Sequence, residues 1–212
     1  MKKGELLFLV IILMIASFFR LWKLSIIPSG LYHDEAINGN EAITLPGQVF
    51  YPENNGREGL YINLISLSFA IFGPSILAMK FVSATIGILT IPGLYLLTKE
   101  LISQITDNKK QETTIALLAS FFLATSFWHT NFSRIAFRAI LVPFILVFAF
   151  YFLFRGFRTK KSCNFVISGI FFGLGFYTYI SYRFVVLLMG VVLFSWYLLY
   201  KKQGLGLSLI HI

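Results

Sequence analysis

Residues 5–24 read ELLFLVIILMIASFFRLWKL, an apolar segment with the length of a membrane-spanning helix. The hydrocarbon core of a bilayer is about 30 Å thick, and roughly 20 apolar residues cross it as a helix. Lys2 and Lys3 precede the segment, and the bulky residues 18–22 (FFRLW) stand where a cleavable signal peptide has small residues. The segment therefore predicts an uncleaved signal anchor.

Further apolar runs approach the length of a span at 81–101, 113–131, 139–156, 164–181 and 184–200. The chain is 57% hydrophobic and 13% charged, which leaves too little polar surface for a soluble domain of 212 residues. We therefore expect an all-α, polytopic membrane protein built as a helical bundle. Residues 204–212 are apolar again and no polar segment follows them. We therefore expect this chain to be the amino-terminal part of a longer protein.

Residues 59–79 are also apolar, but Gly73 and Pro74 interrupt them and leave a run of about 13 residues, a length more typical of an interfacial helix than of a span. If this helix lies on the outer surface and the amino terminus is cytoplasmic, about eleven of the 18 Lys and Arg residues lie inside, as the positive-inside rule favours. An alternative, with 59–79 spanning and the amino terminus outside, gives a similar count but places Lys2 and Lys3 outside.

The net charge of +9 is best explained by this topology, because the basic residues cluster at the ends of apolar runs. We expect no nucleic-acid partner. Cys163 is the single cysteine, which excludes an internal disulfide and a cysteine metal site.

The predicted outer loop, residues 25–58, carries five of the nine acidic residues: Asp34, Glu35, Glu41, Glu53 and Glu58. Carboxylates at a membrane surface are costly unless they are solvated, paired or used. Asp34 and Glu35 precede a short helix expected from about Glu35 to Leu45, so both are candidate catalytic residues, with Asp34 as a general base. The alternative is that Asp34 merely caps this helix.

Four arginines are candidates for binding a lipid phosphate, because arginine forms bidentate hydrogen bonds to phosphate oxygens. Arg134 and Arg138 are four apart and would share one face of a helix, Arg183 opens a helix on the same side, and Arg57 lies in the acidic loop. The alternative is that these side chains extend to lipid headgroups.

Two other residue sets are weaker candidates on the same side. Tyr177, Tyr179 and Tyr182 could form a rim against a sugar or an isoprenoid tail, although close helix packing with an interfacial aromatic belt is the preferred explanation. His33 and His129, with the nearby acids, could hold a divalent metal ion, but their local spacing does not favour it.

The order of several short motifs resembles the C-type, polyprenol-dependent glycosyltransferases, which include protein O-mannosyltransferases, aminoarabinose transferases and rhizobial galacturonosyltransferase-like domains. The motifs are GLYHDEA (30–36), REGLY (57–61), FGPS (72–75), AMKFVSA (78–84) and FSR (132–134). The resemblance implies a helical bundle with juxtamembrane helices on the outer face. It also implies two substrates: a polyprenyl-phosphate-sugar donor, and a hydroxyl acceptor that is a glycan, a lipid or a protein. It further implies sugar transfer with inversion at the outer face of the cell membrane, with Asp34 as the base and the arginines on the departing lipid phosphate.

The chain departs from the family pattern in two places. No acidic residue follows Glu112. The chain therefore has no counterpart of the second catalytic carboxylate that many members carry, and no second acid there to bridge a metal ion. Glu58 and Gly59 stand where the family usually has two prolines. A transporter or flippase for an anionic lipid would use the same arginines without the carboxylates, and a purely structural membrane subunit is the third hypothesis.

Overall fold

The computed structural model describes residues 3–210, and this part of the chain is almost entirely helical. Its elements, in order, are α1 (Lys3–Leu21), α2 (His33–Thr44), β1 (Phe50–Tyr51), β2 (Arg57–Glu58), α3 (Leu60–Phe72), α4 (Ile76–Ile102), α5 (Lys109–Thr125), α6 (Phe127–Arg134), the 3₁₀ helix η1 (Arg138–Ile140), α7 (Leu141–Thr159), α8 (Ser162–Gly175), the 3₁₀ helix η2 (Ile180–Phe184) and α9 (Val185–Ile210). The predicted all-α architecture is confirmed. The described residues form two compact units, divided between Tyr179 and Ile180.

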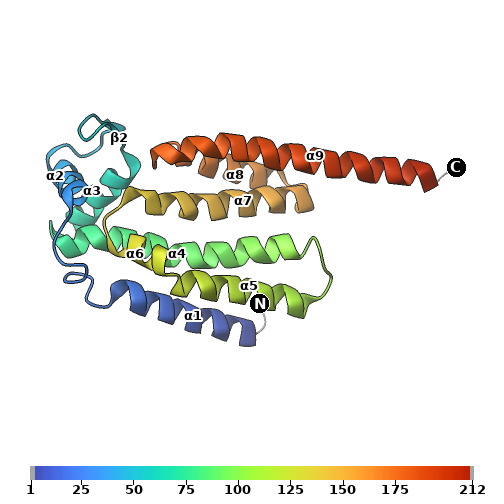
Figure 1. The fold of residues 1–212 in the computed structure, drawn as a ribbon, viewed down its shortest axis with the longest axis horizontal. Coiled ribbons are helices and arrows are strands. Elements are labelled where there is room, and N and C mark those ends of the chain that lie inside the picture. Colours follow the sequence, from blue (N-terminus) through green and yellow to red (C-terminus); the bar gives the residue numbers. More distant parts are fainter. Residues whose placement is uncertain (1–2, 211–212) are drawn as a thin grey trace. The chain divides into compact units, whose positions relative to one another are not determined.

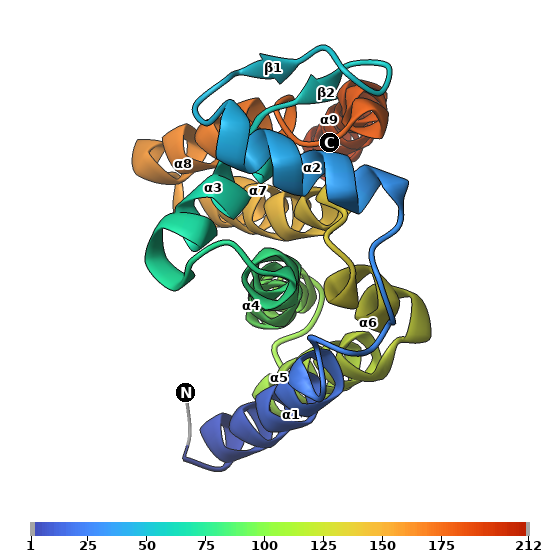
Figure 2. The same cartoon turned by 90° about the vertical axis from the view of Figure 1, so that its left-hand side faces the viewer.

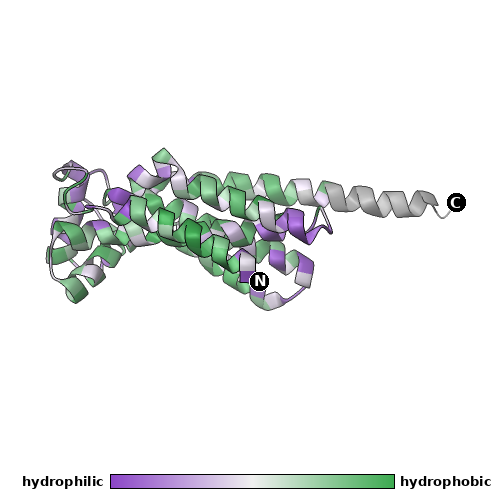
Figure 3. Cartoon of the chain, turned by 90° about the horizontal axis from the view of Figure 1, so that it is seen from below, coloured by the Kyte–Doolittle hydropathy of each residue, from purple (hydrophilic) through white to green (hydrophobic). Residues whose placement is uncertain are grey.

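In the first unit, α1, α4, α5, α7 and α8 form a bundle in which α4 contacts α1, α5 and α7 (Figure 1). The short elements α2 and α3 and the antiparallel hairpin β1–β2 gather at one end of this bundle and lie over the ends of the longer helices (Figure 2). The connection between α4 and α5 lies at the opposite end. Apolar residues line the lengths of these helices and hydrophilic residues gather at the two ends (Figure 3).

Three described helical segments are long and apolar enough to cross a membrane: Lys3–Leu21, Ile76–Ile102 and Arg138–Thr159. The expected span 113–131 is instead a bent pair, α5 and α6, whose axes differ by 54°. Ser126 begins the second helix by accepting a hydrogen bond from the amide of His129. The expected span 164–181 contains α8, which ends at Gly175 after 14 residues.

The helix expected on the surface, within 59–79, is the 13-residue α3, which ends at Gly73 with a φ of 78°. Its buried face packs on α4 and α7 in a cluster that includes Tyr61, Ile65, Met79 and Ile140. Tyr61 is fully buried and its hydroxyl is hydrogen-bonded to Ser83 of α4. This cluster fixes the acidic loop to the ends of the longer helices.

Candidate active site

The first turn of α2 carries both candidate catalytic carboxylates, and the structure gives them different environments. Glu35 is 2% exposed, and its two oxygens accept hydrogen bonds from the amides of Tyr32 at 3.1 Å and Ala136 at 2.7 Å. The bond to Tyr32, which immediately precedes α2, is half of a capping box. The capping expected of Asp34 is therefore performed by Glu35, because α2 begins at His33, two residues earlier than expected.

Asp34 remains partly exposed, with 40% of its side-chain surface accessible. Its Oδ1 accepts a 2.7 Å hydrogen bond from Nδ2 of Asn54, in the hairpin connection, and lies 3.8 Å from Nδ1 of His33. Oδ2 has no hydrogen-bond partner among the residues that the structure describes. The carboxylate is thus oriented by a neutral amide and keeps one oxygen free to accept a proton.

Asp34 belongs to an electrostatic cluster with Tyr32, Arg138 and Tyr179. Burial raises the pKa of the Tyr32 phenol above its ordinary value, the carboxylates of Asp34 and Glu35 raise this pKa further, and Arg138 lowers it. Arg138 and the partly exposed carboxylate of Asp34 therefore both act electrostatically on the same phenol. Sequence reasoning missed Tyr32, because tyrosine next to an acidic pair carries no signal of its own.

Arg138 is held by two groups from distant parts of the chain. Its Nη1 donates to Oε2 of Glu58 at 2.9 Å, and its guanidinium lies 5.2 Å from the ring centroid of Tyr179. Tyr179 in turn meets Phe137 edge to face. The Arg138 side chain is 13% exposed, so it is positioned rather than freely solvated.

Arg57 lies in a buried polar cluster behind α2. It is 1% exposed, donates to Oδ1 of Asn38 at 2.6 Å and forms an ion pair with Glu41. Its Nε donates to the carbonyl of Glu53 at 3.2 Å. These contacts join the hairpin to α2 and occupy the guanidinium expected to bind phosphate.

Arg134 is also engaged by the protein itself. It is 7% exposed and donates to three carbonyls at the end of α1 and just after it: Phe19 at 2.7 Å, Trp22 at 2.6 Å and Ile27 at 2.9 Å. The expectation that Arg134 and Arg138 share one helix face is wrong, because α6 ends at Arg134 and Ile135 is extended.

Lys80 of α4 anchors the start of the acidic loop, a role that sequence reasoning missed. It is fully buried, and its Nζ donates to the carbonyls of Pro28 at 2.9 Å and Gly30 at 3.2 Å. Lys80 and Arg134 together hold the turn that precedes Asp34.

The model of the family of dolichyl-phosphate-mannose-protein mannosyltransferases matches residues 60–212, most of the chain. The chain belongs to this family. No curated protein and no solved structure matches it. Its family and its apolar helices make it an integral membrane glycosyltransferase of the C type.

The tyrosines expected to form a rim in this glycosyltransferase lie in both units. In the first unit, Tyr177 is exposed and its carbonyl accepts the amide of Leu60 at 3.2 Å, while Tyr179 contacts Arg138. Tyr182 and Arg183 belong to η2 in the second unit, where Arg183 is exposed. Tyr179 is therefore the tyrosine that the structure brings to Arg138.

The two histidines and the acids form no metal-binding group in the described part of this glycosyltransferase. His129 is buried, and its Nδ1 lies 2.8 Å from Nη2 of Arg20, whereas His33 is exposed beside Asp34. No group of three His, Cys, Asp or Glu side chains with metal-binding geometry occurs in residues 3–210. The divalent metal ion stays a sequence-based hypothesis, with no set of ligands among the described residues.

Proposed function

We propose that this membrane glycosyltransferase moves a sugar, a hexose, from a polyprenyl-phosphate-linked donor to a hydroxyl acceptor with inversion of configuration. The reaction takes place at the end of the bundle that carries α2, α3 and the hairpin, on the outer face of the cell membrane. Asp34 is the general base. Arg138 faces the departing lipid phosphate, and Arg183, in the second unit, stays a candidate from the sequence alone.

One observation supports Asp34 above the other carboxylates of the loop: it is the one that combines partial exposure, a fixed orientation and a neighbouring cation. Glu35 accepts hydrogen bonds from two backbone amides, Glu41 forms an ion pair with Arg57, and Glu58 forms an ion pair with Arg138. Glu53 is exposed in the hairpin connection. A base must be oriented and yet have an oxygen free for the acceptor hydroxyl.

The proposed step is a single displacement. The acceptor oxygen attacks the anomeric carbon of the sugar from the side opposite the lipid phosphate, and its proton passes to Oδ2 of Asp34. The bond between the anomeric carbon and the phosphate oxygen breaks, and the phosphate leaves with the electron pair. Arg138 stabilises the negative charge that develops on this phosphate. Attack opposite the leaving group inverts the anomeric configuration.

The charge distribution of the first unit supports the outer location of this end. The opposite end carries eight basic residues, whereas the end with α2, α3 and the hairpin carries six. The eight are Lys3, Lys99, Lys109, Lys110, Arg155, Arg158, Lys160 and Lys161, and the six are Arg20, Lys23, Arg57, Lys80, Arg134 and Arg138. Cytoplasmic loops carry the excess of Lys and Arg. Residues 33–58 accordingly face outward in our proposal.

The decisive experiment assays the full-length protein with a labelled polyprenyl-phosphate sugar. We expect Asp34→Asn, which preserves size and the hydrogen bond from Asn54, to lower the transfer rate by about 10²–10⁴-fold. Glu53→Gln removes an equal charge nearby and should leave the rate unchanged. Transfer by Asp34→Asn at the wild-type rate would overturn the assignment of the base. Donor movement across vesicles without transfer would favour the lipid-transporter alternative.

Orientation is tested separately by labelling cysteines with a membrane-impermeant reagent. Val49 is 66% exposed in the acidic loop, and the native Cys163 is exposed at the start of α8, at the other end of the first unit. We expect Val49→Cys, in a Cys163→Ser background, to react in intact cells, and Cys163 of the wild type to react only after lysis. The reverse pattern would place the acidic loop in the cytoplasm.

A further inference from the structure

A mixed polar and apolar cavity lies at the end of the bundle opposite Asp34. Its volume is about 750 Å³, within the range of small-molecule sites, and it is bounded by α1, the end of α4 and the start of α5. Lys99, Lys109, Lys110 and Thr113 form part of its polar wall, and Phe8 and Leu117 form its apolar wall. None of these residues belongs to the candidate active site.

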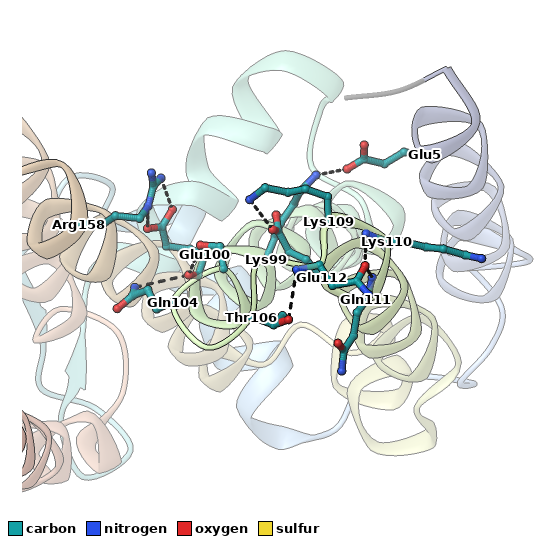
Figure 4. Close-up of polar contacts among 12 residues, drawn as sticks. Glu5, Lys99, Glu100, Gln104, Thr106, Lys109, Lys110, Gln111, Glu112 and Arg158 are labelled. Atoms are coloured by element: carbon teal, nitrogen blue, oxygen red, sulfur yellow. Dashed lines mark hydrogen bonds and ion pairs between the residues drawn. The ribbon is translucent and has the colours of Figure 1, made fainter.

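Two of the three lysines of this cavity are paired with carboxylates on its wall (Figure 4). Lys99 pairs with Glu5, which also accepts a hydrogen bond from Tyr95, and Lys109 donates to Oε2 of Glu112 at 2.9 Å. Each of these pairs is neutral as a unit. Ion pairing therefore holds the ammonium groups of Lys99 and Lys109 at the cavity. Each ammonium group keeps at least one hydrogen-bond donor for a ligand.

Lys110 supplies the excess charge. It lines the same cavity, and no carboxylate within residues 3–210 is found paired with it. Three lysines against two glutamates leave a net charge of +1 on the lining. The hydroxyls of Thr113 and Thr114 add neutral donors beside this charge. Such a wall suits a phosphate group that carries one negative charge.

The apolar wall distinguishes a lipid from a soluble anion. Phe8 is 59% exposed on α1, and Leu117 lies two turns into α5, so both flank the cavity on its bundle side. A soluble phosphate would leave these apolar surfaces exposed, whereas an acyl chain attached to the phosphate would cover them. Basic pockets between transmembrane helices on the cytoplasmic side are typical sites for anionic lipid headgroups.

We propose that this cavity binds an anionic phospholipid of the leaflet opposite the active site. The phosphate contacts Lys110 and the Thr113 hydroxyl, while Lys99 and Lys109 border the headgroup. The acyl chain runs along Phe8 and Leu117. This inference does not depend on the role of Asp34 or on the sugar donor.

The test is native mass spectrometry of the detergent-solubilised full-length protein, titrated with dioleoylphosphatidylglycerol, with dioleoylphosphatidylcholine and with inorganic phosphate. We expect the wild type to bind phosphatidylglycerol more tightly than phosphatidylcholine. Lys110→Gln should weaken phosphatidylglycerol binding by about fivefold, the contribution of one basic residue near an anionic surface. Thr114→Trp, a change at an exposed position, should fill the cavity and weaken binding at least as much.

The matched control is Lys161→Gln, which removes the same charge from an exposed site between α7 and α8 and should leave binding unchanged. Wild-type affinity in both cavity variants would overturn the proposal. It would equally fail if Lys161→Gln weakened binding as much as Lys110→Gln, since the effect would then be general surface charge. Binding of inorganic phosphate as tight as that of phosphatidylglycerol would show a soluble anion to be the ligand.

Discussion

The carboxylate of Glu35 accepts a 2.7 Å hydrogen bond from the backbone amide of Ala136, a residue 101 positions further along the chain. The same carboxylate accepts the amide of Tyr32 at the start of α2. Glu35 therefore joins the turn that carries Asp34 to the segment that carries Arg138. In the proposed mechanism it is a positioning residue that sets the distance between the base and the cation.

Glu35→Ala is expected to destabilise the protein. The substitution leaves two amides without their acceptor, and each charge-assisted hydrogen bond contributes about 1.5–3 kcal/mol. The melting temperature of the purified protein in detergent should fall, whereas Asn40→Ala, at an exposed position of α2, should change it little. Glu35→Gln keeps one acceptor oxygen and should give an intermediate value. A melting temperature of Glu35→Ala equal to that of the wild type would contradict this role.

Gly59 is expected to tolerate neither alanine nor proline. A Cβ at this position would lie 2.1 Å from the carbonyl oxygen of Gln48, and the Gly59 amide donates to the carbonyl of Val49 at 2.9 Å. Alanine would push the hairpin away from α3, and proline would also remove the donor. Both variants should melt below the wild type, with proline lower. Gly169→Ala, where a Cβ meets nothing within 4 Å, is the control and should melt like the wild type.

The same contact explains why this chain departs from the proline pair of its family. Gly59 donates the hydrogen bond that closes the hairpin, a bond that proline cannot make. The sequence alone showed the departure but not its cause, because the acceptor belongs to a turn ten residues earlier.

The elements were predictable where local signals are strong. The apolar length of α1, the stop of α3 at Gly73 and the short helix after the acidic pair all follow from residue patterns. The break between α5 and α6 did not, because Ser126 is neither glycine nor proline. The carbonyls of Leu123 and Ala124, just before the break, accept hydrogen bonds from Arg20, a residue more than 100 positions away.

The candidate site was predictable in composition but not in pairing. Charge counting predicted carboxylates and arginines on one side of the membrane, and in the first unit Arg57, Arg134 and Arg138 contact α2, the turn before it and the hairpin respectively. It did not show that Arg134 binds backbone carbonyls, because every residue carries one and none is marked in the sequence. Which arginine remains available to a ligand is therefore a property of the tertiary structure.

Arg57→Met should make stability depend more steeply on pH. Burial raises the pKa of Glu41 above its ordinary value, and Arg57 opposes that rise. When the pKa of a carboxyl group is higher in the folded than in the unfolded protein, the protein loses stability as the pH rises through the interval between these two pKa values. Without Arg57 the interval widens, so the melting temperature of Arg57→Met should fall from pH 5 to pH 8 more than that of the wild type.

The matched double variant separates charge from packing. Arg57→Met with Glu41→Gln leaves no unpaired charge, so most of the lost stability should return and the added pH dependence should disappear. A pH profile of Arg57→Met parallel to that of the wild type would show that Glu41 is not the titrating group.

Arg20 should be needed for the bend between α5 and α6. It is fully buried and donates to the carbonyls of Ala124 at 2.9 Å and Leu123 at 3.2 Å, next to the break. Unpaired backbone groups in a membrane cost several kcal/mol each. Arg20→Leu should therefore lower the yield of folded protein and its melting temperature, and Arg20→Lys should retain part of both. Met14→Leu, at an exposed position of α1, is the neutral control.

Arg138 should act on the chemical step rather than on stability alone. If it stabilises the charge on the leaving phosphate, Arg138→Ala should lower kcat by about 10²–10³-fold, the effect of removing one stabilising donor. Arg138→Lys keeps the charge but loses the planar contact with Tyr179, so it should recover part of the rate. Tyr179→Phe keeps the ring beside the guanidinium and should leave kcat close to that of the wild type, whereas Tyr179→Leu should lower it. A kcat for Arg138→Ala equal to that of the wild type, measured at saturating donor, would remove Arg138 from the mechanism.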